Sequence, residues 1–249
     1  MSGRSLTIVV PLYREAARAE RLVRALDEFA MARAPQLAVS AALVDDGSDD
    51  GTADRLAAAI RATRDSSRFR LIQHESNRGK GAAVATGVLA ATTDLVLMSD
   101  ADLSAPLSQF DPLLAAVDAG ADIAIGSRDL PGSRLEPPQP LRRRLLAWSF
   151  RALRRHVLLP DIRDTQCGFK LFRGDVARSL FSELATTGWL FDCEILVRAG
   201  LAGLRVVETP IVWRNDPDSR VRPLRDALPT LNALRRIARL QSGERRRTE

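Results

Sequence analysis

The chain has 249 residues, of which 45% are hydrophobic and 27% are charged, a composition typical of a globular protein with a large core and not of a disordered chain. Its formal net charge of +6 favours anionic partners such as nucleotides, nucleic acid or an acidic lipid surface. Two cysteines without a CxxC motif and two histidines argue against a structural zinc site and against a disulfide framework.

The first half of the sequence alternates short apolar runs with segments of helical periodicity. Alternation of this length is typical of an α/β fold, with a mostly parallel central sheet and helices on both faces. The predicted strands are 6–13, a run that ends at Asp45, 69–73, 95–99 and 122–126, and the predicted helices are 16–33, 52–64, 80–91 and 106–119.

The second half changes character after residue 131. Residues 131–140 are rich in Pro and Gly and predict a loop. Residues 141–160 and 224–240 mix arginines with large apolar side chains, which fits helices packed on a core, a nucleic-acid surface or a membrane interface, and two such segments in one basic chain favour the interface. We therefore expect a catalytic domain over 1–223, including an interfacial helix at 141–160, and a C-terminal amphipathic helix with a charged tail over 224–249.

No uncharged stretch in the sequence is long enough to span a bilayer, and a strand-like run begins where a signal peptide would lie. The sequence thus predicts a protein of the cytosol or of a membrane surface, without a transmembrane segment.

Two acidic clusters follow predicted strands, Asp45-Asp46 after one and Asp100-Ala101-Asp102 after another. The carboxyl ends of parallel strands are where open α/β sheets bind ligands, and paired carboxylates suit a divalent cation that also contacts phosphates. The alternative for each cluster is a solvated turn that caps the next helix. The position of the second cluster beyond a buried strand favours a nucleotide-linked substrate.

Three further segments carry polar groups of unusual density. Residues 77–81 fit neither the Walker A pattern nor GxGxxG, so we expect a tight turn with its N–H groups and Lys80 near a nucleotide, or a purely structural turn. Residues 164–170 precede an apolar pair, 171–172, that predicts core. Asp192, in the aromatic segment 188–194, is a candidate helix cap before the apolar run 195–201.

Together these segments resemble the family 2 glycosyltransferases, nucleotide-sugar enzymes with the GT-A fold, and among them the polyprenyl-phosphate sugar synthases, especially the dolichyl-phosphate glucosyltransferases. The likeness covers nearly the whole chain in order and is most specific in the runs DTQCGFK and WLFDCE. It lies in residues 9–15, 44–52, 77–81, 99–102, 126–128, 162–172, 189–196 and 207–213.

The resemblance implies roles for individual residues. Asp100 and Asp102 would reach the diphosphate and its metal, Mg²⁺ or Mn²⁺, and Arg128 and Asp192 join them as catalytic candidates. Arg128 and Arg143 would meet the acceptor phosphate, and Arg220 the donor diphosphate. The other residues expected at the donor are Pro11, Tyr13, Glu15, Val44, Asp46, Lys80 and Ala101. Three positions depart from the family pattern, namely Arg14 for Asn, Ala147 for Ser and Arg220 for Lys.

The reaction that the resemblance implies is transfer of a hexose, glucose from UDP-glucose in the first instance, to a polyprenyl or dolichyl monophosphate with inversion. Its partners would be the nucleotide sugar, the lipid phosphate and the cytoplasmic face of a membrane, to which the protein binds peripherally. The alternatives are a GDP-mannose-dependent synthase, a transferase that acts on a sugar hydroxyl with Asp164, Asp192 or Glu194 as base, and a non-catalytic binding module. The sequence does not specify the sugar, the polyprenol length or the oligomeric state.

Overall fold

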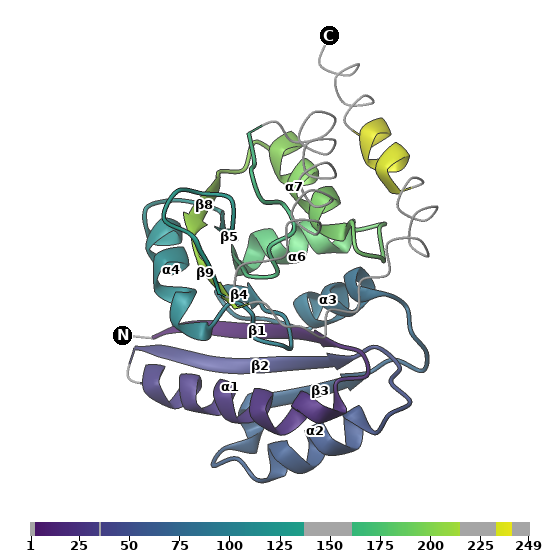
Figure 1. Cartoon of the computed structure of the whole chain (residues 1–249). Coiled ribbons are helices and arrows are strands. Elements are labelled where there is room, and N and C mark those ends of the chain that lie inside the picture. The colour runs from purple at the N-terminus through teal and green to yellow at the C-terminus, as the bar shows by residue number, and fades with distance from the viewer. Residues whose placement is uncertain (1–2, 35, 137–160, 215–232, 241–249) are drawn as a thin grey trace.

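The computed structural model describes residues 3–34, 36–136, 161–214 and 233–240. Its centre is a seven-stranded sheet in the order β3-β2-β1-β4-β7-β5-β8, in which every neighbouring pair is parallel except the two pairs that β7 makes (Figure 1). The predicted α/β architecture with a mostly parallel sheet is therefore confirmed. The strands are β1 Arg4–Leu12, β2 Leu37–Asp45, β3 Phe69–Gln73, β4 Leu95–Met98, β5 Ile123–Ser127, β7 Lys170–Arg173 and β8 Val206–Pro210.

Helices cover both faces of this sheet because the side chains of a strand alternate between the two faces. Leu6, Ile8 and Val10 of β1 point into one core with α1, α2 and α4, whereas Val9 points into a second core with α3, α6 and α7. The helices are α1 Ala19–Arg33, α2 Thr52–Arg61, α3 Lys80–Leu89, α4 Phe110–Asp118, α6 Gly174–Ser182 and α7 Phe191–Leu201, with short 3₁₀ turns at Ala16–Arg18, Ser66–Arg68 and Leu107–Gln109. Two of the predicted helices, 16–33 and 106–119, thus begin with a 3₁₀ turn or an extended residue and become α-helical one turn later.

The helix α3 packs unusually close to the sheet because it carries small side chains on the buried face. A Cβ atom at Gly87 would lie 2.5 Å from Val9 Cγ1 and 3.1 Å from Val44 Cγ2. Lys80, the first residue of this helix, lies with its Nζ 2.6 Å from Asp100 Oδ1, just beyond the carboxyl end of β4. The fold therefore places one end of α3 beside the acidic strand tips.

The prediction of a loop over 131–140 is wrong at Arg134–Glu136, which forms β6. This strand pairs in parallel with β9, Val212–Arg214, as a separate two-stranded sheet. All three β6 residues are exposed, so the segment has no apolar alternation from which a strand could be predicted. Its partner lies almost 80 residues later in the chain, and only tertiary pairing makes it a strand.

The C-terminal helical segment is described over residues 233–240 and lies beside α7 (Figure 1). Ile237 is fully buried against Leu190, Cys193 and Val197, and Leu234 packs at the edge of the same cluster. In this part the apolar side chains face the protein, as expected of a helix packed on a core. The predicted interfacial helix at 141–160 lies outside the described residues, and the division at residue 223 stays a prediction. None of the helices in the described part of the chain is long and apolar enough to cross a membrane.

Candidate active site

The acidic cluster after β4 lies at the carboxyl end of the sheet, as predicted. Asp100 is partly exposed, and its Oδ1 lies 2.6 Å from Lys80 Nζ. Ala101 is buried, while the Asp102 Oδ1 accepts a hydrogen bond from the Ser104 amide at 2.8 Å. The following Leu103 has a φ of 53°, so the chain turns sharply after the two carboxylates. The two aspartates and Lys80 thus come together at one strand tip.

A tight contact below Asp100 fixes its carboxylate. A Cβ atom at Gly168 would lie 1.9 Å from Asp100 Oδ2 and 2.4 Å from its Cγ, so only glycine leaves room for this rotamer. Gly168 follows Cys167, whose Sγ is buried, and burial raises the pKa of this thiol to about 12. Cys167 is therefore a neutral packing residue and not a nucleophile.

Replacing Gly168 with alanine is expected to displace Asp100 and lower kcat/KM by about 10²-fold, the cost of roughly 1 Å of misplacement at a reacting centre. The free energy of unfolding should fall by about 1–3 kcal/mol, the usual cost of overpacking. The loss should not be larger, because the atoms that must move belong to the end of the partly exposed Asp100 side chain. Steady-state kinetics and thermal unfolding would measure the two effects. Gly200→Ala is the matched control, since a Cβ atom there meets nothing within 4 Å, and equal losses in both variants would contradict the role given to Gly168.

A second lysine lies behind the first. Lys170 of β7 is buried, its Nζ donates to the Cys167 carbonyl oxygen at 2.6 Å, and it forms an ion pair with Asp192 Oδ1. Burial raises the pKa of Asp192, although Lys170 and Lys80 oppose this effect. Burial would lower the pKa of Lys80, but Asp100 and Asp192 outweigh it and the pKa is raised, so the ammonium is charged at neutral pH. Asp192 lies in the first turn of α7, whose N-cap residue is Leu190, so Asp192 does not occupy the cap position for which it was a candidate.

The start of α3 is held by a backbone contact from the loop before α7. The Thr187 carbonyl oxygen accepts the amides of Gly81 at 2.7 Å and Ala82 at 3.2 Å. For residues 77–81 the sequence left open a turn near a nucleotide and a purely structural turn, and the bond from the Gly81 amide to Thr187 is a structural contact of this turn. Buried Glu194 shapes that loop, because its two oxygens accept the amides of Ala185 at 3.0 Å and of Thr186 at 2.8 Å.

Asp46 organises the turn before α3. Its carboxylate is buried and accepts the Arg78 amide at 2.9 Å, the Gly79 amide at 2.8 Å and a hydrogen bond from His74 Nδ1 at 2.7 Å. Gly79 has a φ of 101°, which an L side chain rarely adopts. Asp45 is also buried and accepts a hydrogen bond from Ser48 Oγ. Both aspartates of the first acidic cluster therefore have structural partners.

The other residues expected at the donor lie around the ends of β1 and β2. Pro11 and Val44 are buried and paired in register across the two strands, and Tyr13 is exposed beyond them. Glu15 forms an ion pair of 2.5 Å with Arg18. Arg14, which departs from the family pattern, binds Asp49 with two nitrogens at 2.7 and 2.6 Å. The arginine at this position thus forms a local ion pair with Asp49.

Arg128 lies at the end of β5, with its guanidinium bonded to Asp164. Nε and Nη2 lie 2.6 and 2.9 Å from the two carboxylate oxygens, and the Arg128 amide donates to the same group at 3.0 Å. Burial would raise the pKa of Asp164, but the charge of Arg128 and its hydrogen bonds hold that pKa well below its usual range. The guanidinium also stacks 4.7 Å from the Trp213 ring centre. These contacts hold the Arg128 side chain in one orientation.

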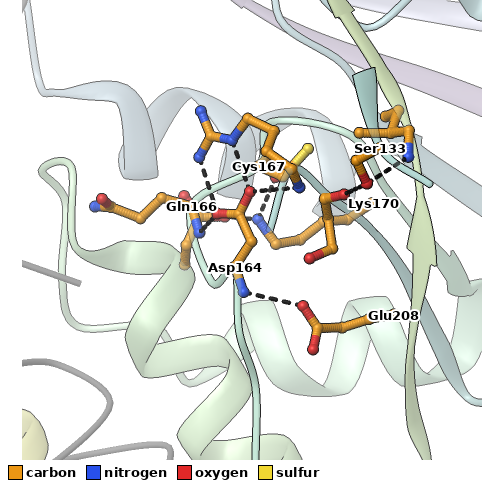
Figure 2. Close-up of polar contacts among 10 residues, drawn as sticks. Ser133, Asp164, Gln166, Cys167, Lys170 and Glu208 are labelled. Atoms are coloured by element: carbon orange, nitrogen blue, oxygen red, sulfur yellow. Dashed lines mark hydrogen bonds and ion pairs between the residues drawn. The ribbon is translucent and has the colours of Figure 1, made fainter. Parts of the chain in front are cut away.

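Figure 2 shows Asp164 at the centre of this polar cluster, with Gln166 and Glu208 bonded to its side chain and backbone, respectively. Glu208 accepts the amides of Arg163 and Asp164, both at 2.9 Å. The sequence resemblance included Asp164 and the segment 207–213, but it did not indicate that Glu208 of β8 accepts the Asp164 amide or that Trp213 of β9 packs on Arg128. The predicted Arg143 and Arg220, and the departing Ala147, lie outside the described residues.

The residues at the β4 tip could hold a divalent cation whose remaining coordination positions are filled by the substrate and water. No group of three or more acidic, cysteine or histidine side chains that could hold a metal occurs within the described ranges. Mg²⁺ and Mn²⁺ commonly take one or two carboxylates and leave the other positions to phosphate and water, and Asp100 and Asp102 supply that number on a partly exposed loop. In the structure, Asp100 Oδ1 is paired with Lys80.

Comparisons with known proteins agree with this geometry. The sequence profile of Glycosyl transferase family 2 matches residues 7–181. The chain is 33% identical over 231 residues to glycosyltransferase AglD of Haloferax volcanii, covering 91% of this chain but 36% of that protein. It is 30% identical over 242 residues to the dolichyl-phosphate beta-glucosyltransferase of Dictyostelium discoideum, covering 93% of this chain and 73% of that protein.

The solved structures show the same fold at lower identity. Glucosyl-3-phosphoglycerate synthase from Mycobacterium tuberculosis, in complex with Mn²⁺, uridine diphosphate and glucosyl-3-phosphoglycerate, superposes with a TM-score of 0.65 at 20% identity. The superposition covers 94% of this chain and 77% of that one. The GT-A fold implied by the sequence resemblance is confirmed.

Proposed function

This chain belongs to glycosyl transferase family 2, and we propose that it is an inverting glycosyltransferase that moves glucose from UDP-glucose to a polyprenyl or dolichyl monophosphate. The observation that carries the proposal is the pair Asp100 and Asp102, which stands at the carboxyl end of β4 with Lys80 bound to the first carboxylate. The 30% identity to a dolichyl-phosphate beta-glucosyltransferase over most of the chain supports the acceptor class.

In this proposal the uridine and ribose lie against the ends of β1 and β2, at Pro11, Tyr13, Glu15, Val44 and Asp46. The diphosphate lies at the β4 tip, where Asp100, Ala101 and Asp102 face it and Lys80 is close. Asp100 and Asp102 would hold Mg²⁺ or Mn²⁺, which, when bound, stabilises the negative charge that develops on the departing UDP. Arg220 would add a permanent positive charge at the donor diphosphate.

The proposed nucleophile is the phosphate of the lipid, which needs no strong base. A phosphomonoester has a second pKa near 6 and is largely dianionic at neutral pH. The three carboxylates considered as bases each have a structural partner, because Asp164 binds Arg128, Asp192 binds Lys170, and Glu194 accepts two backbone amides. Arg128 and Arg143 would instead bring the acceptor phosphate toward the donor against the repulsion of the two anions.

Replacing Asp192 with asparagine tests the acceptor class. We expect a loss in kcat/KM of less than about 100-fold, below the range of about 10²- to 10⁴-fold for a general base, and a pH profile whose acidic limb is still set by the lipid phosphate near pH 6. The measurement is kcat/KM between pH 5 and 9 with a polyprenyl phosphate acceptor. Asp175→Asn, at a carboxylate that is 63% exposed, is the matched control. Loss of the acidic limb together with a larger drop would favour a sugar-hydroxyl acceptor with Asp192 as base.

The lipid acceptor places the proposed reaction at a membrane surface, on the cytoplasmic side, where the arginine-rich segment 141–160 would lie among lipid phosphates. Flotation of the purified protein with anionic and with neutral vesicles would test this placement. Binding to neither kind of vesicle would contradict it.

The activity itself is tested by offering labelled UDP-glucose, GDP-mannose and other nucleotide sugars with a polyprenyl phosphate, with and without Mg²⁺ or Mn²⁺. The proposal expects an organic-extractable product from UDP-glucose that requires the cation. Product from GDP-mannose would correct the donor, and full turnover in excess chelator would overturn the metal-dependent chemistry.

A further inference from the structure

The use of lysine in this chain is confined to the candidate active site. Two of the 37 basic residues are lysines, Lys80 and Lys170, and all the others are arginines. An ammonium is a compact charge with three donors, whereas a guanidinium is a planar fork. Of the two, the ammonium is the group that can take the place of a metal ion at a single carboxylate oxygen. The position of Lys80, 2.6 Å from Asp100 Oδ1, therefore suggests more than a solvated surface pair.

Both members of this ion pair are held in place by their surroundings. Asp100 rests on Gly168, where no Cβ atom would fit. Lys80 begins α3, whose first amides are fixed by the Thr187 carbonyl oxygen, and its Nζ lies 5.2 Å from the centre of the Trp189 ring. The side chains of Lys80 and Asp100 are 18% and 24% exposed, respectively, so the attraction between them is only partly screened by water.

The charges of the cluster are nearly balanced without a metal. Counted as formal charges, Asp100, Asp102 and Asp192 give three negative charges, and Lys80 and Lys170 give two positive ones. A divalent cation alone would reverse the net charge and would have to displace the Lys80 ammonium. A divalent cation that arrives with a diphosphate brings compensating negative charge, and the released ammonium then has a phosphate to bind.

We propose that Lys80 is a positioning residue that occupies Asp100 as a resident cation and yields it to the divalent metal when the donor diphosphate binds. The inference rests on the proposed function, because it takes Asp100 and Asp102 as the metal ligands. It makes metal binding depend on the donor. The free protein binds the metal weakly, and the diphosphate strengthens that binding because it pairs with Lys80 in place of Asp100.

The proposal predicts an unusual effect of removing a positive charge from an active site. The Lys80→Gln variant should bind Mn²⁺ more tightly than the wild type in the absence of nucleotide, by at least about fivefold, the lower end for a coupled binding event. UDP should then strengthen Mn²⁺ binding in the variant less than in the wild type. A lysine that merely supported the fold or the metal ligands would leave Mn²⁺ affinity unchanged or weaken it.

The measurement is the free Mn²⁺ concentration, read from its electron paramagnetic resonance signal, during titration of each purified protein with and without UDP. Arg78→Gln is the matched control, since it removes one positive charge from the same turn, and the side chain of Arg78 is exposed. Lys80→Arg keeps the charge and should keep Mn²⁺ binding weak. Circular dichroism and thermal unfolding check that each variant is folded.

A second measurement is made on the wild type. Because the chain has two lysines, ¹³C labelling of lysine gives two side-chain ε signals, and the signal that is lost in Lys80→Arg is that of Lys80. Mg²⁺ with UDP should shift the Lys80 signal by breaking its pair with Asp100 and should move the signal of buried Lys170 much less.

The outcomes separate this inference from the function on which it rests. Tighter Mn²⁺ binding by Lys80→Gln than by Arg78→Gln, with a shifted Lys80 signal, supports the exchange. Equal affinity in the wild type and Lys80→Gln, equal tightening in both variants, or an unmoved Lys80 signal at saturating Mg²⁺ and UDP overturns the inference alone. Failure of the wild type to bind Mn²⁺ even with UDP overturns the proposed metal site and the inference together.

Discussion

Replacing Asp102 with alanine is expected to lower kcat/KM by about 10²- to 10³-fold, the range seen when one preorganised group that stabilises transition-state charge is removed. Asp102 lies on a partly exposed loop beyond β4, where its carboxylate accepts a hydrogen bond from the Ser104 amide. Loss of one such bond changes stability by about 1 kcal/mol. The variant should therefore remain folded while it loses turnover of the nucleotide sugar, as measured by radiolabelled product and by thermal unfolding.

The matched control for this change lies at the other end of the same strand. Asp94 precedes β4 and accepts the Ser5 amide at 2.8 Å and the Ser5 hydroxyl at 2.7 Å, so Asp94→Ala loses two hydrogen bonds away from the strand tip. We expect it to keep near-normal kcat/KM. Undiminished turnover by Asp102→Ala would contradict the placement of the donor diphosphate at this loop.

Replacing Asp164 with alanine is expected to destabilise the protein by about 3–5 kcal/mol, the cost of leaving one member of a buried ion pair without its partner. The Asp164 side chain is 1% exposed and that of Arg128 is 21% exposed. The substitution also removes the acceptor for the amides of Arg128 and Gln166. Urea unfolding followed by circular dichroism would give the change in the free energy of unfolding.

Asp118→Ala is the comparison for this second change. Asp118 pairs with Arg4 at the surface, with side chains 50% and 42% exposed, and such pairs contribute about 0–1 kcal/mol. Similar losses in the two variants would mean that burial of the Arg128–Asp164 pair does not determine its effect.

The same pair has a pH dependence whose direction follows from the carboxyl pKa. That pKa is held below its usual value in the folded protein, so the stabilising effect is complete above the unfolded-state value of about 4 and is lost as the pH falls below it. The free energy of unfolding of the wild type should therefore decrease more between about pH 4 and pH 2 than that of Asp164→Ala. Parallel curves for the two proteins would contradict the assignment.

Most of the sheet and its helices could be predicted from local patterns. Buried strands such as β1 and β4 are continuous apolar runs, and helices such as α2 carry apolar residues at helical spacing, so both are visible in the sequence. The strand β6 could not be predicted, because its three exposed residues become a strand only by pairing with β9. Helix starts were misplaced by about a turn where 3₁₀ turns precede α1 and α4.

The sequence indicated candidate residues for the site, but it did not indicate most of the contacts between them. Asp100, Asp102 and Lys80 meet as expected because strand tips and helix starts share one edge of an α/β sheet. The pairing of Lys170 with Asp192, the stacking of Arg128 on Trp213 and the need for glycine under Asp100 join segments that lie 22 to 85 residues apart or depend on a single rotamer. Sequence spacing carries no signal for such contacts.

The antiparallel strand β7 has a consequence for synthesis of the protein on the ribosome. β4 and β5 do not pair with each other; each pairs with β7, which is translated more than 40 residues after β5. A nascent chain that has emerged as far as β5 therefore exposes unpaired strand edges, which are prone to intermolecular pairing. Gly168 is translated just before β7 and Lys170 within it. The contact below Asp100, the Lys170–Asp192 pair and the closure of the sheet are therefore completed in the same late step.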